Sequence, residues 1–327
     1  MEDLKVHVVQ GATEAMWVMT SEYAQSEQPD VELEGQYGGR FEEADRRYAR
    51  FLKASKQDKS LMQRLNGLNA GKHLYDPMSG PFSVSTELVS MESWTRAGEV
   101  DPVVTGELLA RSAADRKCAV LLNAGYAFGS ASWPMGLALR DSFGAALKSF
   151  HVIGKAGGLA GGVGDYQVPS SFFLWDRVGA PASVAPEVYR IDVSKVDLSL
   201  WSGKQPQVYS GGLMTVPSVV LQSHHLLDAA KLPPWGAVGI EMESLWFKRA
   251  LPDTPGLYLY YTSDIPQAAD SSLAHESYPW AEGQTLFNGL TRMVLVDILS
   301  GASTRVPALG VVALVGLALM AHGPERR

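Results

Sequence analysis

Residues 152–169 read VIGKAGGLAGGVGDYQVP and carry the clearest fold signal in the chain. The apolar run FHVIG, residues 150–154, overlaps the start of this stretch. It ends at Gly154, and Gly157 and Gly158 follow shortly after. Because glycine has no side chain, an anion or a sugar can approach the backbone N–H groups after such a strand. No helix follows, so this is not the dinucleotide fingerprint, and a tight turn is the plain alternative. We predict a ligand-binding turn at the carboxyl end of a strand, where α/β sheets hold their ligands.

Apolar runs and helical patterns alternate on either side of this stretch. Besides FHVIG, strands are predicted at residues 5–9, 117–125, 236–240 and 256–262, and helices at about residues 107–116, 133–148, 243–250 and 281–300. Strands that are apolar throughout and joined through helices are typical of a sheet covered on both faces. The predicted fold class is therefore α/β, with a mostly parallel, mixed central sheet flanked by helices.

A single domain is the simplest division of the chain. It covers residues 1–301, with residues 21–115 as an N-terminal insertion or elaboration, and an apolar C-terminal tail follows at residues 302–327. Within the tail, residues 306–321 carry no charge, and a helix of that length would span roughly 24 Å of a hydrocarbon core roughly 30 Å thick. A membrane anchor and an apolar segment packed on the domain or on a partner subunit both stay open.

The composition is that of a folded globular protein. Apolar residues make up 46% and charged residues 19%, which disfavours disorder and a multi-span membrane protein. The net charge of -7 offers no basic field for a nucleic-acid partner. No signal peptide is visible, so we expect a cytoplasmic protein, with membrane tethering through residues 306–321 left open. The single cysteine, Cys118, forms no internal disulfide and is predicted to lie in a buried strand.

Two carboxylates stand at a second predicted junction between a strand and a helix. Residues 239–244 read GIEMES, in which Glu241 and Glu243 flank Met242 where an apolar run ends. A carboxylate accepts two hydrogen bonds at once and can therefore hold two neighbouring sugar hydroxyls. The alternative is structural, because acidic residues are favoured in the first turn of a helix.

A third segment delivers a Ser-Asp pair. Residues 261–266 read YTSDIP and place Ser263 and Asp264 at the end of the apolar run GLYLYYT. A partly desolvated aspartate there can share a proton with, or donate it to, a leaving group that becomes negative. A helix cap or a turn is the structural alternative.

Taken jointly, the three segments resemble the nucleoside phosphorylase superfamily, which includes purine nucleoside phosphorylases, methylthioadenosine nucleosidases and AMP nucleosidases. The superfamily's G-x-x-G-G turn and its G-D-x-x-x-P continuation are matched at Gly154, Gly157, Gly158, Gly164, Asp165 and Pro169. Its acidic-Met-Glu element and its strand-borne Ser-Asp are matched at Glu241, Met242, Glu243, Ser263 and Asp264. The motifs are most similar to those of AMP nucleosidases, which share G-K-x-G-G-L around Lys155 and G-D-Y at Tyr166. The resemblance covers roughly residues 118–300.

This resemblance implies a role for each residue. Asp264 would protonate N7 of a purine as the glycosidic bond lengthens, and Glu243 would hold the ribose hydroxyls. Met242 would pack on the sugar, and Glu241 would support the pocket. The turn at residues 154–158 would lie beside ribosyl C1′ and its nucleophile, and an oxocarbenium-like transition state is implied.

The sequence departs from the phosphorylases at the nucleophile. Their phosphate-binding arginine before the glycine turn is absent, because residues 151–153 read HVI. Lys155 could instead meet inorganic phosphate or a 5′-phosphate of the substrate. The loop at residues 125–130, GYAFGS, is bulkier than the anion or sugar loop it resembles. Glu14, shortly after Gly11, could position a water molecule in a hydrolase.

Three functions stay open, with an order of preference. The resemblance favours an N-ribosyl hydrolase similar to AMP nucleosidase that acts on a purine nucleoside or nucleotide. The alternative enzyme is a purine nucleoside phosphorylase, with inorganic phosphate as co-substrate, and the alternative of another class is a nucleoside-binding or sensing protein without turnover. No metal site and no other cofactor are expected, and assembly as a homo-oligomer is implied by the resemblance only.

Overall fold

The structure of the protein is a computed structural model of the whole chain. It describes residues 4–11, 15–16, 19, 73–76, 86–94, 100–101, 104–105, 109, 113–174, 182–183, 206–217, 223–268 and 280–300. Glu14 and the tail at residues 302–327 lie outside this set, as does most of the expected insertion at residues 21–115. Among the helices of the described part, none is long and apolar enough to cross a membrane.

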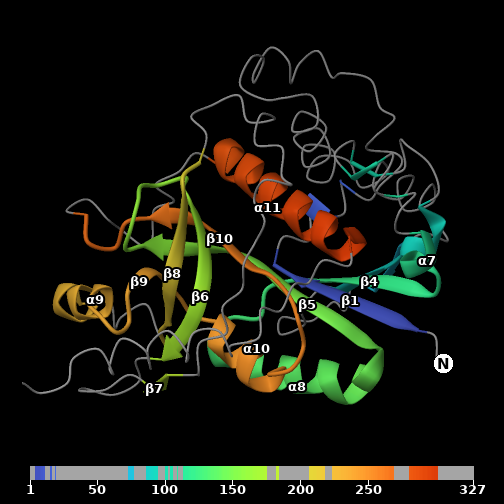
Figure 1. Cartoon of the computed structure of the whole chain (residues 1–327), viewed down its shortest axis with the longest axis horizontal. Coiled ribbons are helices and arrows are strands. Elements are labelled where there is room, and N and C mark those ends of the chain that lie inside the picture. Colours follow the sequence, from blue (N-terminus) through green and yellow to red (C-terminus); the bar gives the residue numbers. More distant parts are fainter. Residues whose placement is uncertain are drawn as a thin grey trace, which may run out of the picture.

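A mixed sheet forms the centre of the α/β fold (Figure 1). Its strands are β1 (Lys5–Gln10), β2 (His73–Asp76), β3 (Thr86–Ser90), β4 (Ala119–Ala124), β5 (Leu147–Gly158), β6 (Tyr166–Leu174), β7 (Ala182–Ser183), β8 (Val208–Thr215), β9 (Ala237–Glu241) and β10 (Tyr258–Asp264). The order is β10-β6-β8-β9-β5-β1-β4-β3-β2, with β7 on β6. Since β10 also pairs with β5, the strands β5, β10, β6, β8 and β9 close into a barrel, and the remaining strands of the order extend it as an open sheet.

The α/β class is confirmed, but the sheet is less parallel than predicted. Strand β5 runs parallel to β1 and β10 and antiparallel to β9. Parallel and antiparallel pairings are equally represented among the described strands. Two of the antiparallel pairings, β10–β6 and β5–β9, lie in the barrel, where β6, β8 and β9 run against β5 and β10. The apolar runs in the sequence do not show strand direction.

The predicted glycine turn is wrong in its position. Strand β5 continues through Gly154 and ends only at Gly158. A Cβ atom on Gly154 would lie 2.6 Å from the ring of Tyr260, and one on Gly157 would lie 2.6 Å from Pro266. These glycines therefore make room for side chains of β10 and of the residues after it, and the turn itself follows at residues 159–165.

Helices cover both faces of the sheet (Figure 1). They are α7 (Ala113–Arg116), α8 (Ser132–Phe143), α9 (His224–Lys231), α10 (Ser244–Ala250) and α11 (Trp280–Ser300), with short 3₁₀ turns η1 (Met91–Ser93), η3 (Gly129–Ala131) and η4 (Gly144–Ala146). Helices α8 and α10 lie together on one face, and α11 lies on the other (Figure 1). Gly136 of α8 contacts Ala250 of α10, where a Cβ atom would approach within 2.6 Å.

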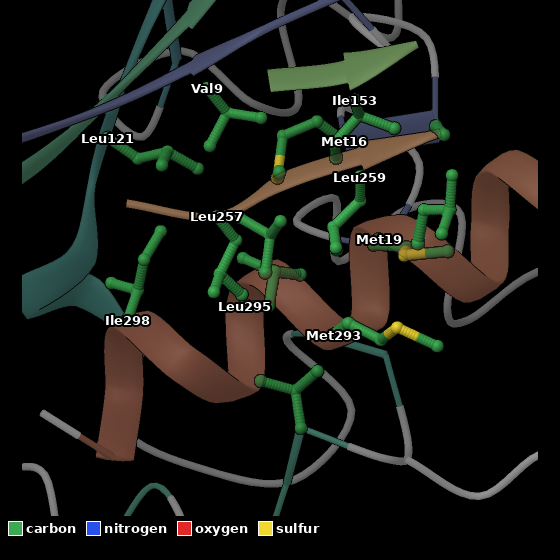
Figure 2. Packing of buried hydrophobic residues seen from close by; sticks show 14 of the residues in the cluster. Val9, Met16, Met19, Leu121, Ile153, Leu257, Leu259, Met293, Leu295 and Ile298 are labelled. Atoms are coloured by element: carbon green, nitrogen blue, oxygen red, sulfur yellow. The ribbon is translucent and has the colours of Figure 1, made fainter. Parts of the chain in front are cut away.

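Helix α11 packs against the sheet and also against residues outside it. Figure 2 shows Leu295 and Ile298 of α11 against Val9 and Leu121 of the sheet. The same core includes side chains that follow β1 or lie in the expected insertion, namely Met16, Met19, Val89, Met91, Trp94, Val100, Val104 and Leu109. A buried ion pair joins Arg292 Nε of α11 to Asp101 Oδ2 at 3.1 Å. With β2 and β3 paired beside β4, the described parts of residues 21–115 are integral to the sheet and core.

Two local predictions are wrong for backbone reasons. Cys118 is a half-buried turn residue with φ of 56°, and β4 begins only at the next residue. Helix α8 ends at Phe143 instead of residue 148, because Gly144 adopts φ of 49° and the chain turns into β5.

A buried hydrogen-bond chain joins β1 to β5 on the face that α11 covers. Leu257 N donates to His151 Nδ1 at 3.1 Å, so the ring proton of neutral His151 lies on Nε2, which faces Ser149 Oγ at 2.8 Å. The hydroxyl of Ser149 then faces His7 Nδ1 at 2.8 Å. Burial, and secondarily the nearby His7, lower the pKa of His151 from 6.5 to about 3.

This chain predicts a stability cost in acid. Below pH 6.5 the unfolded chain protonates residue 151 while the folded chain does not, so His151 contributes stability at neutral pH that is lost as pH falls towards 3. Compared with His151→Asn, whose amide oxygen can still accept the Leu257 N–H, the wild type should lose about 2 kcal/mol more unfolding free energy between pH 6.5 and 4.5. Urea unfolding at several pH values measures this difference. Parallel curves for the two proteins would contradict the assignment.

Candidate active site

The two glutamates after β9 have different environments. Glu241 is buried, and its Oε2 accepts Glu243 N at 2.6 Å and Ser244 N at 2.7 Å. Its Oε1 accepts the hydroxyl of Thr215, which lies opposite it on β8. Burial raises the pKa of Glu241, and these three donors act against that shift. Glu241 is therefore bound within the protein and holds the start of α10.

Glu243 faces the loop that follows β4. Its Oε1 accepts Gly129 N at 3.2 Å, and its Oε2 accepts Met242 N at 3.2 Å. The side chain is only half-buried, so its remaining lone pairs can meet a ligand. Desolvation first, and the negative charge of Glu241 second, raise the pKa of Glu243 to about 7. This carboxyl group therefore changes its charge near neutral pH.

Tyr126 connects this carboxylate to the ends of three strands. Its hydroxyl donates to Ile153 O of β5 at 3.0 Å, and its ring stacks on Phe128 at a centroid distance of 5.8 Å. A Cβ atom on Gly11, after β1, would lie 3.3 Å from the Tyr126 ring and 2.0 Å from Ile153 O. Burial, then the proximity of Tyr261 and Glu243, raises the pKa of Tyr126. A neutral aromatic ring thus covers the carboxyl ends of β1 and β4 beside β5.

Asp264 ends β10 with half of its carboxylate satisfied. Oδ1 accepts the hydroxyl of Ser263 at 2.7 Å. The whole residue is only 8% exposed. Its Oδ2 is buried and has no hydrogen-bond partner among the described residues. A buried carboxylate oxygen without a donor costs free energy, so it suits a group that a ligand completes.

The two carboxylates are presented at different levels of β5. Ser244, next to Glu243, contacts the hydroxyl of Tyr260, which pairs with Gly154. Asp264 pairs with Gly157, three residues further along the strand. The two pairing positions, Gly154 and Gly157, are about 10 Å apart along β5. This arrangement suits a ligand with hydroxyls at one end and a hydrogen-bonding base at the other.

The remaining predicted residues separate into ligand-facing and structural positions. Lys155 lies on β5 between the two levels with an exposed side chain. Met242 is half-buried and packs beside Ile240. Asp165 is structural, because its Oδ2 accepts Gly162 N at 2.8 Å and its Oδ1 accepts Gln207 N at 2.9 Å. In the described part of the chain, no three His, Cys, Asp or Glu residues are placed to hold a metal ion.

Sequence reasoning missed three side chains of the site and one backbone donor. They are Thr215, Ser244, Tyr260 and the N–H of Gly129. Thr215 had a visible signal, because it ends the run GGLMT just before Val-Pro, as a polar residue at the end of a strand does. Gly129 lies in the loop at residues 125–130 that the resemblance had singled out, but the sequence does not show which backbone N–H of that loop donates, since every residue except proline has one.

Fold and site together define an α/β protein with a closed mixed barrel and a carboxylate-lined site at the ends of β9 and β10. The chain belongs to the family described as "Family of unknown function (DUF6909)", whose model matches residues 47–300. No curated protein matches the sequence.

Several solved nucleosidase structures are similar to this chain at low sequence identity. The 5′-methylthioadenosine/S-adenosylhomocysteine nucleosidase of Colwellia psychrerythraea, in complex with adenine, has a TM-score of 0.47 and 12% identity, over 91% of this chain and 95% of that one. The Campylobacter jejuni nucleosidase has a TM-score of 0.47 and 11% identity, over 91% and 97%. A mutant futalosine hydrolase of Helicobacter pylori has a TM-score of 0.45 and 11% identity, over 91% and 97%. These proteins belong to the nucleoside phosphorylase and nucleosidase superfamily, which the sequence motifs resemble.

Proposed function

We propose that this protein hydrolyses the N-glycosidic bond of a purine nucleoside or nucleotide. The observation that carries the proposal is the buried Oδ2 of Asp264, which has no donor among the described residues, at the end of a strand beside Gly157. Glu243 supplies the second element, a half-buried carboxylate whose free lone pairs suit a pair of vicinal hydroxyls.

The two carboxylates divide the reaction between them. Glu243 holds the sugar hydroxyls, while Asp264 hydrogen-bonds to N7 of the base. As the C1′–N9 bond breaks, the N7 proton comes from Asp264 and the base leaves neutral. Water forms the new C1′–O bond, and the proton it releases returns the acid to its starting state. Purines are favoured because a pyrimidine has no N7.

Water is proposed as the nucleophile on the basis of charge. Tyr126 covers the carboxyl ends of β1 and β4, where an anion would otherwise meet backbone N–H groups. The N–H groups at the start of α10 are also taken, because Glu241 accepts two of them. Phosphate would have to bind near the carboxylate of Glu243, which repels an anion, whereas a neutral water molecule meets no such repulsion.

Release of free base tests the function directly. The full-length protein is incubated with AMP, adenosine, inosine and methylthioadenosine, with and without inorganic phosphate. We expect base release at the same rate in both conditions, with the free sugar or sugar phosphate as co-product. Release that requires phosphate would identify a phosphorylase, and binding without release would identify a nucleoside sensor.

Lys155 provides a test of nucleotide against nucleoside. If its ammonium group meets a 5′-phosphate, Lys155→Ala should raise the KM for AMP by about twofold to fivefold and leave the KM for adenosine unchanged, because an exposed charge pair contributes at most about 1 kcal/mol. Lys148→Ala is the matched control, since Lys148 is an exposed lysine at the other end of β5. Equal effects of Lys155→Ala on both substrates would exclude the contact.

A further inference from the structure

Side chains from β8 and β9 occupy the first N–H groups of α10. Glu241 accepts the N–H groups of Glu243 and Ser244, and Thr215 Oγ1 accepts Leu245 N at 3.3 Å. The first N–H groups of a helix have no partner within it, so these bonds fix the direction in which the chain leaves β9. Glu243 lies between the end of β9 and the start of α10, so these bonds also position its side chain.

Thr215 makes two hydrogen bonds with one hydroxyl. Its oxygen accepts Leu245 N, and its proton is donated to Glu241 Oε1. The hydroxyl of Thr215 and the N–H groups of Glu243 and Ser244 therefore all donate to Glu241, and such donors favour the carboxylate over the protonated acid. These donors oppose the rise in the pKa of Glu241 that burial causes. The ionisation of Glu241, two residues from Glu243, therefore depends in part on the Thr215 hydroxyl.

We propose that Thr215 is a positioning residue, which acts through Glu241 to set the ionisation and the orientation of the sugar-binding Glu243. The proposal rests on the proposed function for its link to turnover. Thr215 itself touches no substrate, since its hydroxyl is buried between β8, β9 and α10.

Among the described titratable groups around Glu243, Glu241 is the one whose charge opposes the ionisation of Glu243. Tyr126, from the loop after β4, and Tyr260, from β10, both interact with Glu243. Burial raises the pKa of each tyrosine, so both are neutral near pH 7. The backbone N–H groups of Gly129 and Met242 favour the carboxylate, and Glu241 opposes it.

Removing the Thr215 hydroxyl should move the pH dependence in a defined direction. In Thr215→Val, Glu241 loses a donor and protonates more readily, so its negative charge near Glu243 decreases. The pKa of Glu243 then falls, and its carboxylate persists to lower pH. For the wild type, kcat/KM for base release should rise with pH through about 7. We expect this limb to move about 0.5 to 1 pH unit lower in Thr215→Val, and to stay in place in Thr215→Ser, which keeps the hydroxyl.

A titration that does not depend on turnover separates this proposal from the proposed function. The full-length protein carries glutamate labelled with ¹³C at the side-chain carboxyl, and the Glu243 signal is the one missing in Glu243→Gln. A lower titration midpoint in Thr215→Val, with an unchanged midpoint in Thr215→Ser, supports the proposal even where no substrate is cleaved. Unchanged midpoints in both variants, or equal shifts in both, would overturn it.

Glu241→Gln is the second variant, for the case in which Thr215→Val does not fold. It removes the charge directly, so the Glu243 midpoint should fall by at least as much. Because the new amide NH₂ faces one of the donors to Glu241, thermal unfolding checks that the fold is retained. A Glu243 midpoint that stays near 7 in Glu241→Gln would overturn the proposal, because the charge of Glu241 would then have no effect on Glu243.

Discussion

Asp264→Asn is expected to lower kcat for base release by about 10²- to 10⁴-fold, with little change in the KM. Asparagine has the shape of aspartate, and its carbonyl oxygen can still accept the hydroxyl of Ser263. The other oxygen, Oδ2, becomes an amide NH₂ that cannot give up a proton. The base then has to leave without protonation at N7, which raises the barrier of the chemical step more than it weakens binding.

The measurement compares kcat and KM of the wild type, Asp264→Asn and a matched control. Asp141→Asn is that control, because Asp141 lies exposed on α8 and pairs with its neighbour Arg140. Thermal unfolding of all three proteins checks that the fold is retained. Full turnover in Asp264→Asn would rule out Asp264 as the acid, and an equal loss in Asp141→Asn would show that the effect is not local.

The parts of the fold that sequence could predict are those that a local apolar run defines. Strands β4, β9 and β10 each begin with a continuous apolar run, and β1 contains the run VHVV. Helix α11 combines a long helical pattern with an apolar face. Strands β6 and β8 are interrupted by YQVPSS and YSGG, so their local signal is weak. Their position follows from long-range pairing that closes the barrel, which no local pattern encodes.

The site shows the same division between residue type and environment. Sequence identified Glu241 and Glu243 as a pair of carboxylates at the end of a strand, and both lie there. It could not separate their roles, because these depend on Thr215 and Gly129, which lie 26 and 114 residues away from the glutamates they contact. Three internal donors bind Glu241, and Glu243 keeps lone pairs for a ligand.

The glycines of β5 show how a correct motif can have a different physical cause. Sequence reasoning attributed Gly154 to the close approach of a ligand. In the structure, the space that its missing side chain leaves is filled by the ring of Tyr260, whose hydroxyl reaches Ser244 at the start of α10. The glycine therefore acts on the site indirectly, by letting β10 support the turn that carries Glu243.

Glu243→Gln is expected to lower kcat/KM by about 10²-fold and to damage both KM and kcat. The carboxylate has lone pairs left for two hydroxyls after it accepts Gly129 N and Met242 N, but an amide has one oxygen and two donors. Its NH₂ group would face one of these N–H donors, so the side chain must turn or leave a buried donor unpaired. Losing two hydrogen bonds to a charged group costs about 3 kcal/mol. The part of these bonds that also forms with the bound substrate affects the KM, and the part that forms only in the transition state affects kcat.

The same substitution removes the group that titrates near pH 7, which gives a second readout. In the wild type, the fraction of Glu243 that is ionised falls below pH 7, so kcat/KM should fall with it. The glutamine side chain of the variant does not titrate, so the small remaining activity should be flat across this range. The control is Glu92→Gln, an exposed glutamate of η1, which should keep both the rate and the pH limb. A pH limb near 7 that survives in Glu243→Gln would mean that another group titrates there, and Glu243 would lose its place as the sugar-binding carboxylate.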